Sequence, residues 1–173
     1  ELGEKVGETP FDAISDLLVK EKGAISQLIF GVSGDRETDA PLRQLIRHRL
    51  GGYATDAIDM GAGRPHPASY GTYPRILGKY VREERLLSLE EAIRKMTSFP
   101  ANRLNLKRRG LLRKGYFADL VVFDEARIND KATYENPRQF PEGIEYVIVN
   151  GQILLERGSL NPSKPGKVLR RAE

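Results

Sequence analysis

Residues 24–30, AISQLIF, form a short apolar run between Gly23 and Gly31, which is typical of a buried strand. Apolar residues recur at helical spacing over residues 42–49, and residues 51–55, GGYAT, can form a second short strand. A strand, a helix and a strand with short connections predict a right-handed βαβ unit with parallel strands. The first part of the chain is therefore predicted to be α/β.

Helices are predicted on both sides of this unit. Thr9 suits an N-cap and Pro10 suits the first helical position, so a helix is expected over residues 10–22. A capping box that begins at Ser88 predicts a second helix. The other elements expected before residue 110 are a long loop at 56–71, a helix at 73–84 and a short turn at 101–104.

The pattern changes to β after residue 110. Residues 118–124 form one apolar strand, and residues 146–155 form a hairpin on the Asn150-Gly151 turn, because this dipeptide suits the backbone of a type I′ turn. The change places a domain boundary near residue 110. We expect one domain over residues 1–110 and a second over residues 111–173.

The composition argues against membrane proteins, secreted proteins and nucleic-acid-binding proteins. The chain has 173 residues, of which 39% are hydrophobic and 30% charged, a balance typical of globular proteins. It has no run close to the roughly 18 apolar residues of a membrane helix and no signal-peptide pattern, so a soluble cytoplasmic protein without a membrane partner is expected. The net charge is only +4, and no nucleic-acid motif accompanies basic clusters such as Lys107-Arg108-Arg109. No nucleic-acid partner is therefore expected.

Two polar side chains of the predicted loop are candidates for chemistry. Asp56 follows a predicted parallel strand, where catalytic groups of α/β folds gather, although an Asp there can instead brace the loop through backbone amides. His66 lies between Pro65 and Pro67 on a stiff segment, although a loop histidine can simply bond a neighbouring carbonyl. His48 is expected at the surface. Two histidines without cysteine do not by themselves make a zinc site, so no metal ligand is assigned in this chain.

Several motifs follow one another along nearly the whole chain. They are YATDA at 53–57, RPHP at 64–67, YGTYPRILG at 70–78, EAIRKMTS at 91–98, PA at 100–101, GLL at 110–112, GYFADLVVFD at 115–124, GIEYVIVNG at 143–151 and PGKVLR at 165–170. In this combination they resemble the end of the catalytic domain in the N-acyl-D-amino-acid deacylases (D-aminoacylases) of the amidohydrolase superfamily.

The resemblance implies a fold and a reaction. It implies a (β/α)₈ barrel whose last two strands lie near residues 24–30 and 52–55, followed by the C-terminal strands of a small β-sandwich. It implies zinc in the complete enzyme, held by ligands upstream of Glu1, and none in this chain alone. It also implies that Asp56 takes a proton from the zinc-bound water and delivers it to the leaving amine. The chain is then the last third or so of a zinc-dependent amidohydrolase that hydrolyses the amide bond of N-acyl amino acids.

The sequence departs from the family pattern where a substrate carboxylate would bind. The usual His-Pro-Arg is here His66-Pro67-Ala68, so an arginine that resembles a bidentate partner of that carboxylate is replaced by alanine. Arg64 or Arg75 can substitute for it. Arg64, His66 and Arg75 are therefore the expected substrate-binding residues, and the sequence leaves the substrate and its stereochemistry open.

A function of another class stays open from the sequence. The chain can be a structural or interaction module that reuses this part of the fold without chemistry. In either case an incomplete barrel leaves strand edges open near residues 24–30 or 118–124. Self-association, or pairing with a missing N-terminal part, is therefore expected, and the other partner of the complete enzyme is a small-molecule amide.

Overall fold

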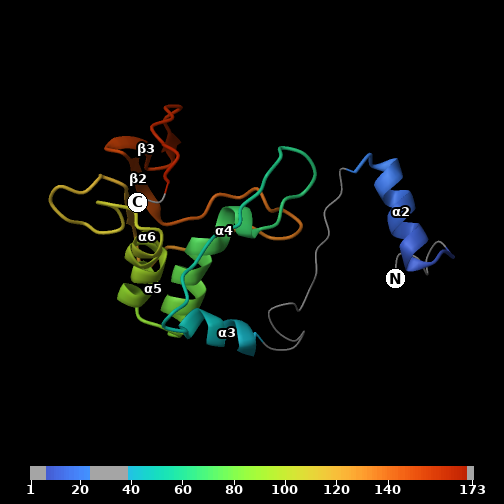
Figure 1. The fold of residues 1–173 in the computed structure, drawn as a ribbon, viewed down its shortest axis with the longest axis horizontal. Helices are drawn as coiled ribbons and strands as arrows, with labels where there is room; N and C mark the ends of the chain where they lie inside the picture. Colours follow the sequence, from blue (N-terminus) through green and yellow to red (C-terminus); the bar gives the residue numbers. More distant parts are fainter. Residues whose placement is uncertain (1–6, 24–38, 171–173) are drawn as a thin grey trace. The chain divides into compact units, whose positions relative to one another are not determined.

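The computed structural model describes residues 7–23 and 39–170. They fall into two units, residues 1–42 and 43–173, each of which is described by itself. Figure 1 shows the described elements along the chain, with α2 to α6, β2 and β3 labelled. The strand predicted at residues 24–30 lies outside the described residues. None of the described helices has the length and hydrophobicity needed to cross a membrane.

Helix α2 (Pro10–Lys20) lies in the first unit and confirms the helix predicted at residues 10–22. Its N-cap is Thr9, whose hydroxyl oxygen accepts a hydrogen bond from the Asp12 amide at 3.2 Å. The chain leaves the helix at Gly23, which has φ +78° and donates its amide to the Leu18 carbonyl at 2.8 Å. The start and end of α2 are therefore set by residues within one turn of them.

The second unit contains most of the remaining helices. Helix α3 (Ala40–Arg47) confirms the helical spacing over residues 42–49. It is followed by α4 (Ala68–Arg75), the π-helix η1 (Ile76–Glu83), α5 (Leu89–Met96) and α6 (Ser98–Arg103). Ser88 caps α5 as predicted, because its hydroxyl oxygen accepts a hydrogen bond from the Glu91 amide at 3.2 Å. The buried side chains of this unit include Ile76, Leu77, Tyr80, Val81, Ala92, Ala101, Ile128 and Lys95.

The long loop ends earlier than the sequence suggested. A loop was expected over residues 56–71 and a helix only from residue 73, whereas α4 begins at Ala68 and continues directly into η1. Gly71 lies inside the helix because its missing side chain lets the helix approach Asp130, whose Cβ would be 2.8 Å from an added Cβ. The Thr72 hydroxyl also donates to the Ala68 carbonyl at 2.8 Å. Packing against a distant segment thus overrides the loop preference of glycine.

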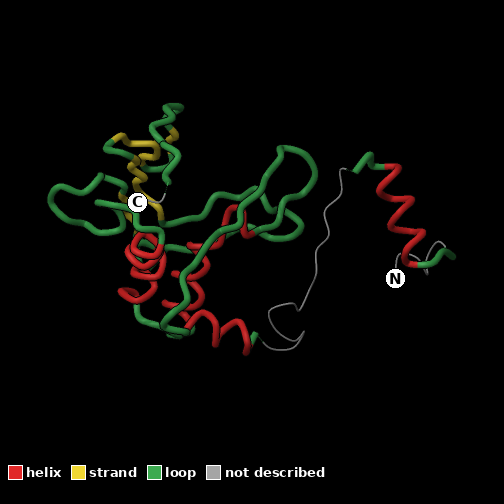
Figure 2. The backbone as a smooth tube through the Cα atoms, viewed as in Figure 1, coloured by secondary structure: helices red, strands yellow, loops and turns green. Residues whose placement is uncertain are grey.

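The C-terminal part forms a four-stranded antiparallel sheet. The strands are β1 (Leu120–Phe123), β2 (Ile144–Val149), β3 (Gln152–Glu156) and β4 (Ser159–Leu160), in the order β1-β2-β3-β4. The strand predicted at 118–124 and the hairpin predicted at 146–155 are confirmed. Asn150 and Gly151 have φ +48° and +80°, as a type I′ turn requires. Figure 2 shows that loops make up much of the remaining chain.

The strand predicted at residues 51–55 is wrong in the described structure. These residues run as an irregular segment, and the described sheet is antiparallel throughout. The Tyr53 amide donates instead to the carbonyl of Lys95, at 3.3 Å. A strand needs a second extended segment to supply its hydrogen bonds, and no described segment lies beside residues 51–55 in that way. The domain boundary near residue 110 stays a prediction.

Candidate active site

The loop that carries the candidate residues, 51–67, is anchored at Tyr53. The Tyr53 hydroxyl donates to the Ile46 carbonyl at 2.9 Å, and the Tyr53 carbonyl accepts a hydrogen bond from the Tyr73 hydroxyl at 3.4 Å. Burial, with the nearby Glu91 carboxylate, raises the pKa of Tyr53 to about 12. The phenol therefore stays protonated and keeps donating over the whole neutral range. The loop leaves the helices at a firmly held point three residues before Asp56.

Asp56 lies on this loop with an exposed side chain. Its backbone has φ +45°, a left-handed conformation that Asp tolerates better than most residues. The Asp56 carboxylate makes no hydrogen bond or ion pair with any described residue. It does not brace the loop through backbone amides, which was the alternative reading of the sequence. The carboxylate is available to accept or deliver a proton.

His66 and Arg64 lie on the same loop in different environments. His66 Nδ1 accepts a hydrogen bond from the Ala68 amide at 3.0 Å, and Nε2 lies 3.4 Å from the Tyr134 hydroxyl. A neutral imidazole that accepts at Nδ1 carries its proton on Nε2, so Nε2 is the donor to Tyr134. Arg64 is exposed and makes no hydrogen bond or ion pair with the described residues. Arg64 is thus the more available of the two for a ligand.

Arg75 is engaged in an ion pair within the chain. Its Nη1 lies 3.1 Å from Oδ2 of Asp130, whose side chain is only 11% exposed. Burial acts to lower the pKa of Arg75, but the Asp130 carboxylate outweighs it, and the net effect is a raised pKa. An arginine committed to a nearly buried carboxylate is a weak candidate for holding another one.

A turn over residues 59–63 shapes the middle of the loop. Asp59 Oδ1 accepts a hydrogen bond from the Gly61 amide at 2.8 Å, and Oδ2 accepts one from the Tyr70 hydroxyl at 2.8 Å. Both oxygens also accept hydrogen bonds from Arg138, each at 2.9 Å. These donors, Arg138 foremost, hold the pKa of Asp59 well below its usual range. Asp59 is therefore ionised and holds the turn closed.

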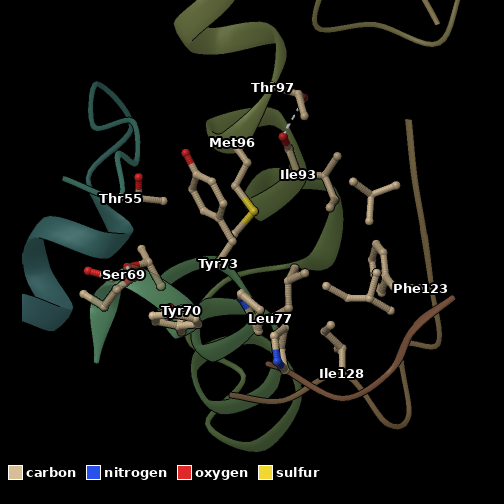
Figure 3. Close-up of a pocket in the computed structure, with 16 residues that line it drawn as sticks. Thr55, Ser69, Tyr70, Tyr73, Leu77, Ile93, Met96, Thr97, Phe123 and Ile128 are labelled. Carbon is tan, nitrogen blue, oxygen red and sulfur yellow. Dashed lines mark hydrogen bonds between the residues drawn. The ribbon is translucent and has the colours of Figure 1, made fainter. Parts of the chain in front are cut away.

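A cavity of about 420 Å³ adjoins this loop. Figure 3 shows Thr55 and Tyr73 on one side of it and Phe123 and Ile128 on the other. Its lining is mainly apolar and includes Leu77 and other aliphatic side chains. Several of its hydroxyl groups already donate to backbone carbonyls. Thr55, which precedes Asp56, thus lines a largely apolar cavity.

No metal centre is formed by the described residues alone. Within residues 7–23 and 39–170, no group of three or more His, Cys, Asp or Glu side chains lies close enough to hold a metal ion. Asp56 is a single carboxylate, and Nδ1 of His66 is engaged by the Ala68 amide. The described donor set does not fit zinc, because a catalytic zinc takes three protein ligands.

Sequence reasoning missed the residues that hold the loop in place. The pattern Asp59-x-Gly61 is a recognisable Asx turn and offered a local indication. Arg138 and Tyr134 gave no such indication, because Arg138 is 79 residues from Asp59 in the chain. Their contribution depends entirely on how the second unit folds.

Comparison with known proteins identifies relatives that match between 62% and 96% of this chain. The N-acyl-D-aspartate deacylase of Alcaligenes xylosoxydans xylosoxydans is 37% identical over 167 residues, which is 96% of this chain and 33% of that protein. The D-aminoacylase of the same organism is 47% identical over 108 residues, 62% of this chain and 22% of that protein. Its N-acyl-D-glutamate deacylase is 41% identical over 131 residues, 75% of this chain and 26% of that protein. The chain spans about a third or less of these relatives.

A solved structure shares the fold. It is the N-acyl-D-glutamate deacylase of Bordetella bronchiseptica, complexed with zinc and a phosphonate inhibitor that mimics the tetrahedral intermediate. The match has a TM-score of 0.71 and 36% identity, and it covers 78% of this chain and 28% of that one. The model of the amidohydrolase family matches residues 14–155. The chain therefore belongs to the amidohydrolase family, and its relatives are N-acyl-D-amino-acid deacylases.

Proposed function

We propose that this chain is the C-terminal part of a zinc-dependent amidohydrolase that hydrolyses the amide bond of N-acyl amino acids. The observation that carries the proposal is the Asp56 carboxylate, which is exposed on a well-anchored loop and has no partner among the described residues. The relatives, an N-acyl-D-aspartate deacylase and an N-acyl-D-glutamate deacylase, support the reaction class. Zinc is proposed for the complete enzyme, with ligands from outside the described residues, because the matching deacylase structure contains it.

Asp56 acts as the proton carrier in this proposal. Its carboxylate takes a proton from the water that attacks the amide carbonyl and returns that proton to the nitrogen as the carbon–nitrogen bond breaks. The nitrogen then leaves as a neutral amine and the acyl group as a carboxylic acid, which releases its remaining proton to solvent and becomes a carboxylate. A carboxylate without an ion-pair partner suits both steps, because an ion pair would make it a weaker base.

Arg64 is the proposed partner of the substrate carboxylate. It lies on the loop of Asp56 and has no described partner, whereas Arg75 is paired with Asp130. His66 is proposed to orient the loop through Tyr134 and to border the substrate site. The pairing of this chain with an N-terminal part is also a proposal. Strand β1 supports it, because Val121 and Val122 are 55% and 49% exposed on an edge of the described sheet.

The test uses the full-length enzyme and its Asp56→Asn variant with N-acetyl amino acids. We expect kcat to fall by about 10²- to 10⁴-fold, the usual contribution of general acid–base catalysis, while zinc content by elemental analysis stays the same. Asp16→Asn, a matched change on an exposed position of α2, should leave kcat unchanged. A loss smaller than about tenfold would show that Asp56 is not the proton carrier. A wild-type enzyme without hydrolase activity would favour the non-catalytic module.

A further inference from the structure

Residues 130–141, which we name the clasp loop, form a closed loop between β1 and β2. Its ends are joined by two backbone hydrogen bonds, from the Asn129 amide to the Glu142 carbonyl at 3.3 Å and from the Glu142 amide to the Asn129 carbonyl at 3.1 Å. Inside the loop, Gln139 Nε2 donates to the carbonyls of Lys131 and Asn136, at 2.6 and 3.0 Å. A loop closed at its base and bonded across its interior has the character of an Ω-loop. Its tip can therefore hold a side chain in a defined place.

The base of the clasp loop is packed on the α4–η1 helix. Gly71 of α4 and Gly78 of η1 both face this segment. An added Cβ at Gly71 would lie 2.8 Å from Asp130 Cβ, and one at Gly78 would lie 2.7 Å from Asn129 Oδ1. Arg75 pairs with Asp130 on the same helix face. The clasp loop is thus tied to the helix that follows the candidate site.

Arg138 reaches from the clasp loop into the turn at residues 59–63. Its Nε and Nη2 each donate to an oxygen of Asp59 at 2.9 Å, in the bidentate arrangement that is the strongest for arginine and carboxylate. Its Nη1 donates to the Gly63 carbonyl at 2.8 Å, and Nη2 also donates to the Ala62 carbonyl at 3.3 Å. One guanidinium therefore makes four contacts with a turn of five residues. Lysine, with a single ammonium, does not reproduce this geometry.

Two ring contacts also join the clasp loop to residues that follow the turn, one to the earlier loop at His66 and one to α4 at Tyr70. The rings of His66 and Tyr134 meet edge to face with centroids 5.4 Å apart, and those of Tyr70 and Phe140 do so at 5.9 Å. Figure 1 shows the two loops near α4, the earlier loop in teal and green and the clasp loop in orange. The clasp loop therefore contacts the chain at residues 59–63, 66 and 70, all of which follow Asp56 closely in the sequence.

We propose that Arg138 is a positioning residue for the candidate active site, because it fixes the turn that separates Asp56 from Arg64. Asp56 lies three residues before Asp59, and Arg64 directly follows Gly63. When the guanidinium holds Asp59, Ala62 and Gly63 together, the backbone on both sides of the turn has a defined course. This role rests on the proposed function. In this proposal, the C-terminal β part of the chain helps to arrange the loop that carries Asp56.

The experiment compares Arg138→Gln with Arg127→Gln in the full-length enzyme. Arg127 is a suitable control because it lies just outside the clasp loop, its side chain is 65% exposed, and its one ion pair with a described residue is a 3.8 Å contact to Glu145. We expect Arg138→Gln to lower kcat by about 10- to 100-fold, since a misplacement of about 1 Å can cost 10²-fold. Amide hydrogen exchange over residues 57–64 should become faster, while the melting temperature stays close to that of Arg127→Gln. Arg138→Lys should recover only part of kcat.

Asp59→Asn provides a second route to the same contact. It should reproduce the loss of kcat. The double variant with Arg138→Gln should be no slower than the more affected single variant, because each single change already breaks the same ion pair between Arg138 and Asp59. Unchanged exchange and kcat in Arg138→Gln, or equal losses in Arg127→Gln, would overturn the positioning role. If the wild-type enzyme hydrolyses no N-acyl amino acid, the proposed function fails. The exchange measurement then still decides whether Arg138 holds the turn.

Discussion

The Lys95 ammonium lies 2.5 Å from the carbonyl oxygen of Ile46 in the last turn of α3, and the Lys95 residue is completely buried. Its second acceptor is the His48 carbonyl at 2.7 Å, and the ammonium also lies 5.5 Å from the centroid of the Tyr53 ring. Carbonyl groups at the end of a helix lack intrahelical donors and carry partial negative charge. Lys95 therefore caps the C-terminal end of α3 and holds in place the start of the loop at residues 51–67. Burial lowers the pKa of Lys95.

Replacement of Lys95 by methionine should destabilise the chain. The change leaves the Ile46 and His48 carbonyls without this donor, and an unsatisfied buried acceptor costs about 1–3 kcal/mol. Urea denaturation at pH 7 measures the loss. Lys114→Met, on an exposed residue, should change the free energy of unfolding by less than about 0.5 kcal/mol. A Lys95→Met chain as stable as Lys114→Met would rule out the capping role.

Three glycine-to-alanine variants should differ in stability in a fixed order. Gly166 has open space around it and no positive φ, so its replacement should stay within about 0.5 kcal/mol of wild type. Gly151 also has open space but φ +80°, so its replacement should cost about 1–2 kcal/mol for the left-handed backbone alone. Gly143 has φ +80° and an added Cβ would lie 2.5 Å from the Ile128 amide nitrogen, so its loss should be larger still.

Chemical denaturation of the three variants under one set of conditions provides the comparison. Gly143→Ala and Gly151→Ala share the same backbone angle, so their difference isolates the close approach to Ile128. Equal losses for these two variants would show that the β1–β2 connection moves aside at no cost.

The contribution of Asp59 to stability should depend on acid pH. The pKa of Asp59 is lowered in the folded chain, chiefly by its hydrogen bond to Arg138, so folding favours the ionised form. That contribution is complete above the pKa of an unfolded Asp, about 3.9, and is lost as the pH falls toward the folded-state pKa. The difference in unfolding free energy between wild type and Asp59→Asn should therefore be constant from pH 7 to 5 and shrink below pH 4.

The same difference measured in an Arg138→Gln background serves as the control. Without the guanidinium, the difference at pH 6 should be smaller and its decline below pH 4 should flatten. A decline of the same size in both backgrounds would assign the acid sensitivity to the other donors, Tyr70 and Gly61.

Substrate choice in the complete enzyme should respond to Ala68 and Arg64. Ala68 begins α4 and borders the cavity, and an arginine there would add a charge-assisted contact to a substrate carboxylate. Ala68→Arg should raise kcat/KM for N-acetyl-D-amino acids by about tenfold to a hundredfold, which corresponds to about 1.5–3 kcal/mol. Arg64→Ala should raise KM for a free acid but not for the matching amide. Steady-state kinetics on one N-acetyl-D-amino acid and its amide test both variants.

The outcome separates two explanations of the missing arginine. If the wild type already prefers the free acid and only Arg64→Ala abolishes that preference, Arg64 holds the carboxylate. If Arg64→Ala changes both substrates alike, the proposed role of Arg64 is wrong.

Elements built from neighbouring residues could be predicted from the sequence. Thr9-Pro10 located the start of α2, Ser88 located the start of α5, and Asn150-Gly151 located the β2–β3 turn. In each case the capping hydrogen bond or the special backbone angle involves residues within four positions of one another, so the relevant chemistry is visible in a short window. Asp56 was also selected from its neighbours, because it follows the segment predicted as a strand and opens the long loop, and its role stays a prediction.

Features that depend on distant partners could not be predicted in this way. The segment 51–55 has the composition of a strand, but its Tyr53 amide bonds to Lys95. Residues 68–71 look like loop, but they are helical where Gly71 meets Asp130. A strand or a glycine contact exists only when another part of the chain supplies the partner, and the local pattern does not identify that partner.

The sequence by itself determined where α2, α5 and the β2–β3 turn begin, and it singled out Asp56 as the candidate for proton transfer. Only the tertiary structure decided which arginine is committed and which is available, since Arg75 pairs with Asp130 and Arg138 pairs with Asp59. These ion pairs join residues 55 and 79 positions apart. Their formation depends on the packing of the clasp loop against α4, and that packing results from the fold of the whole second unit rather than from any local run of residues.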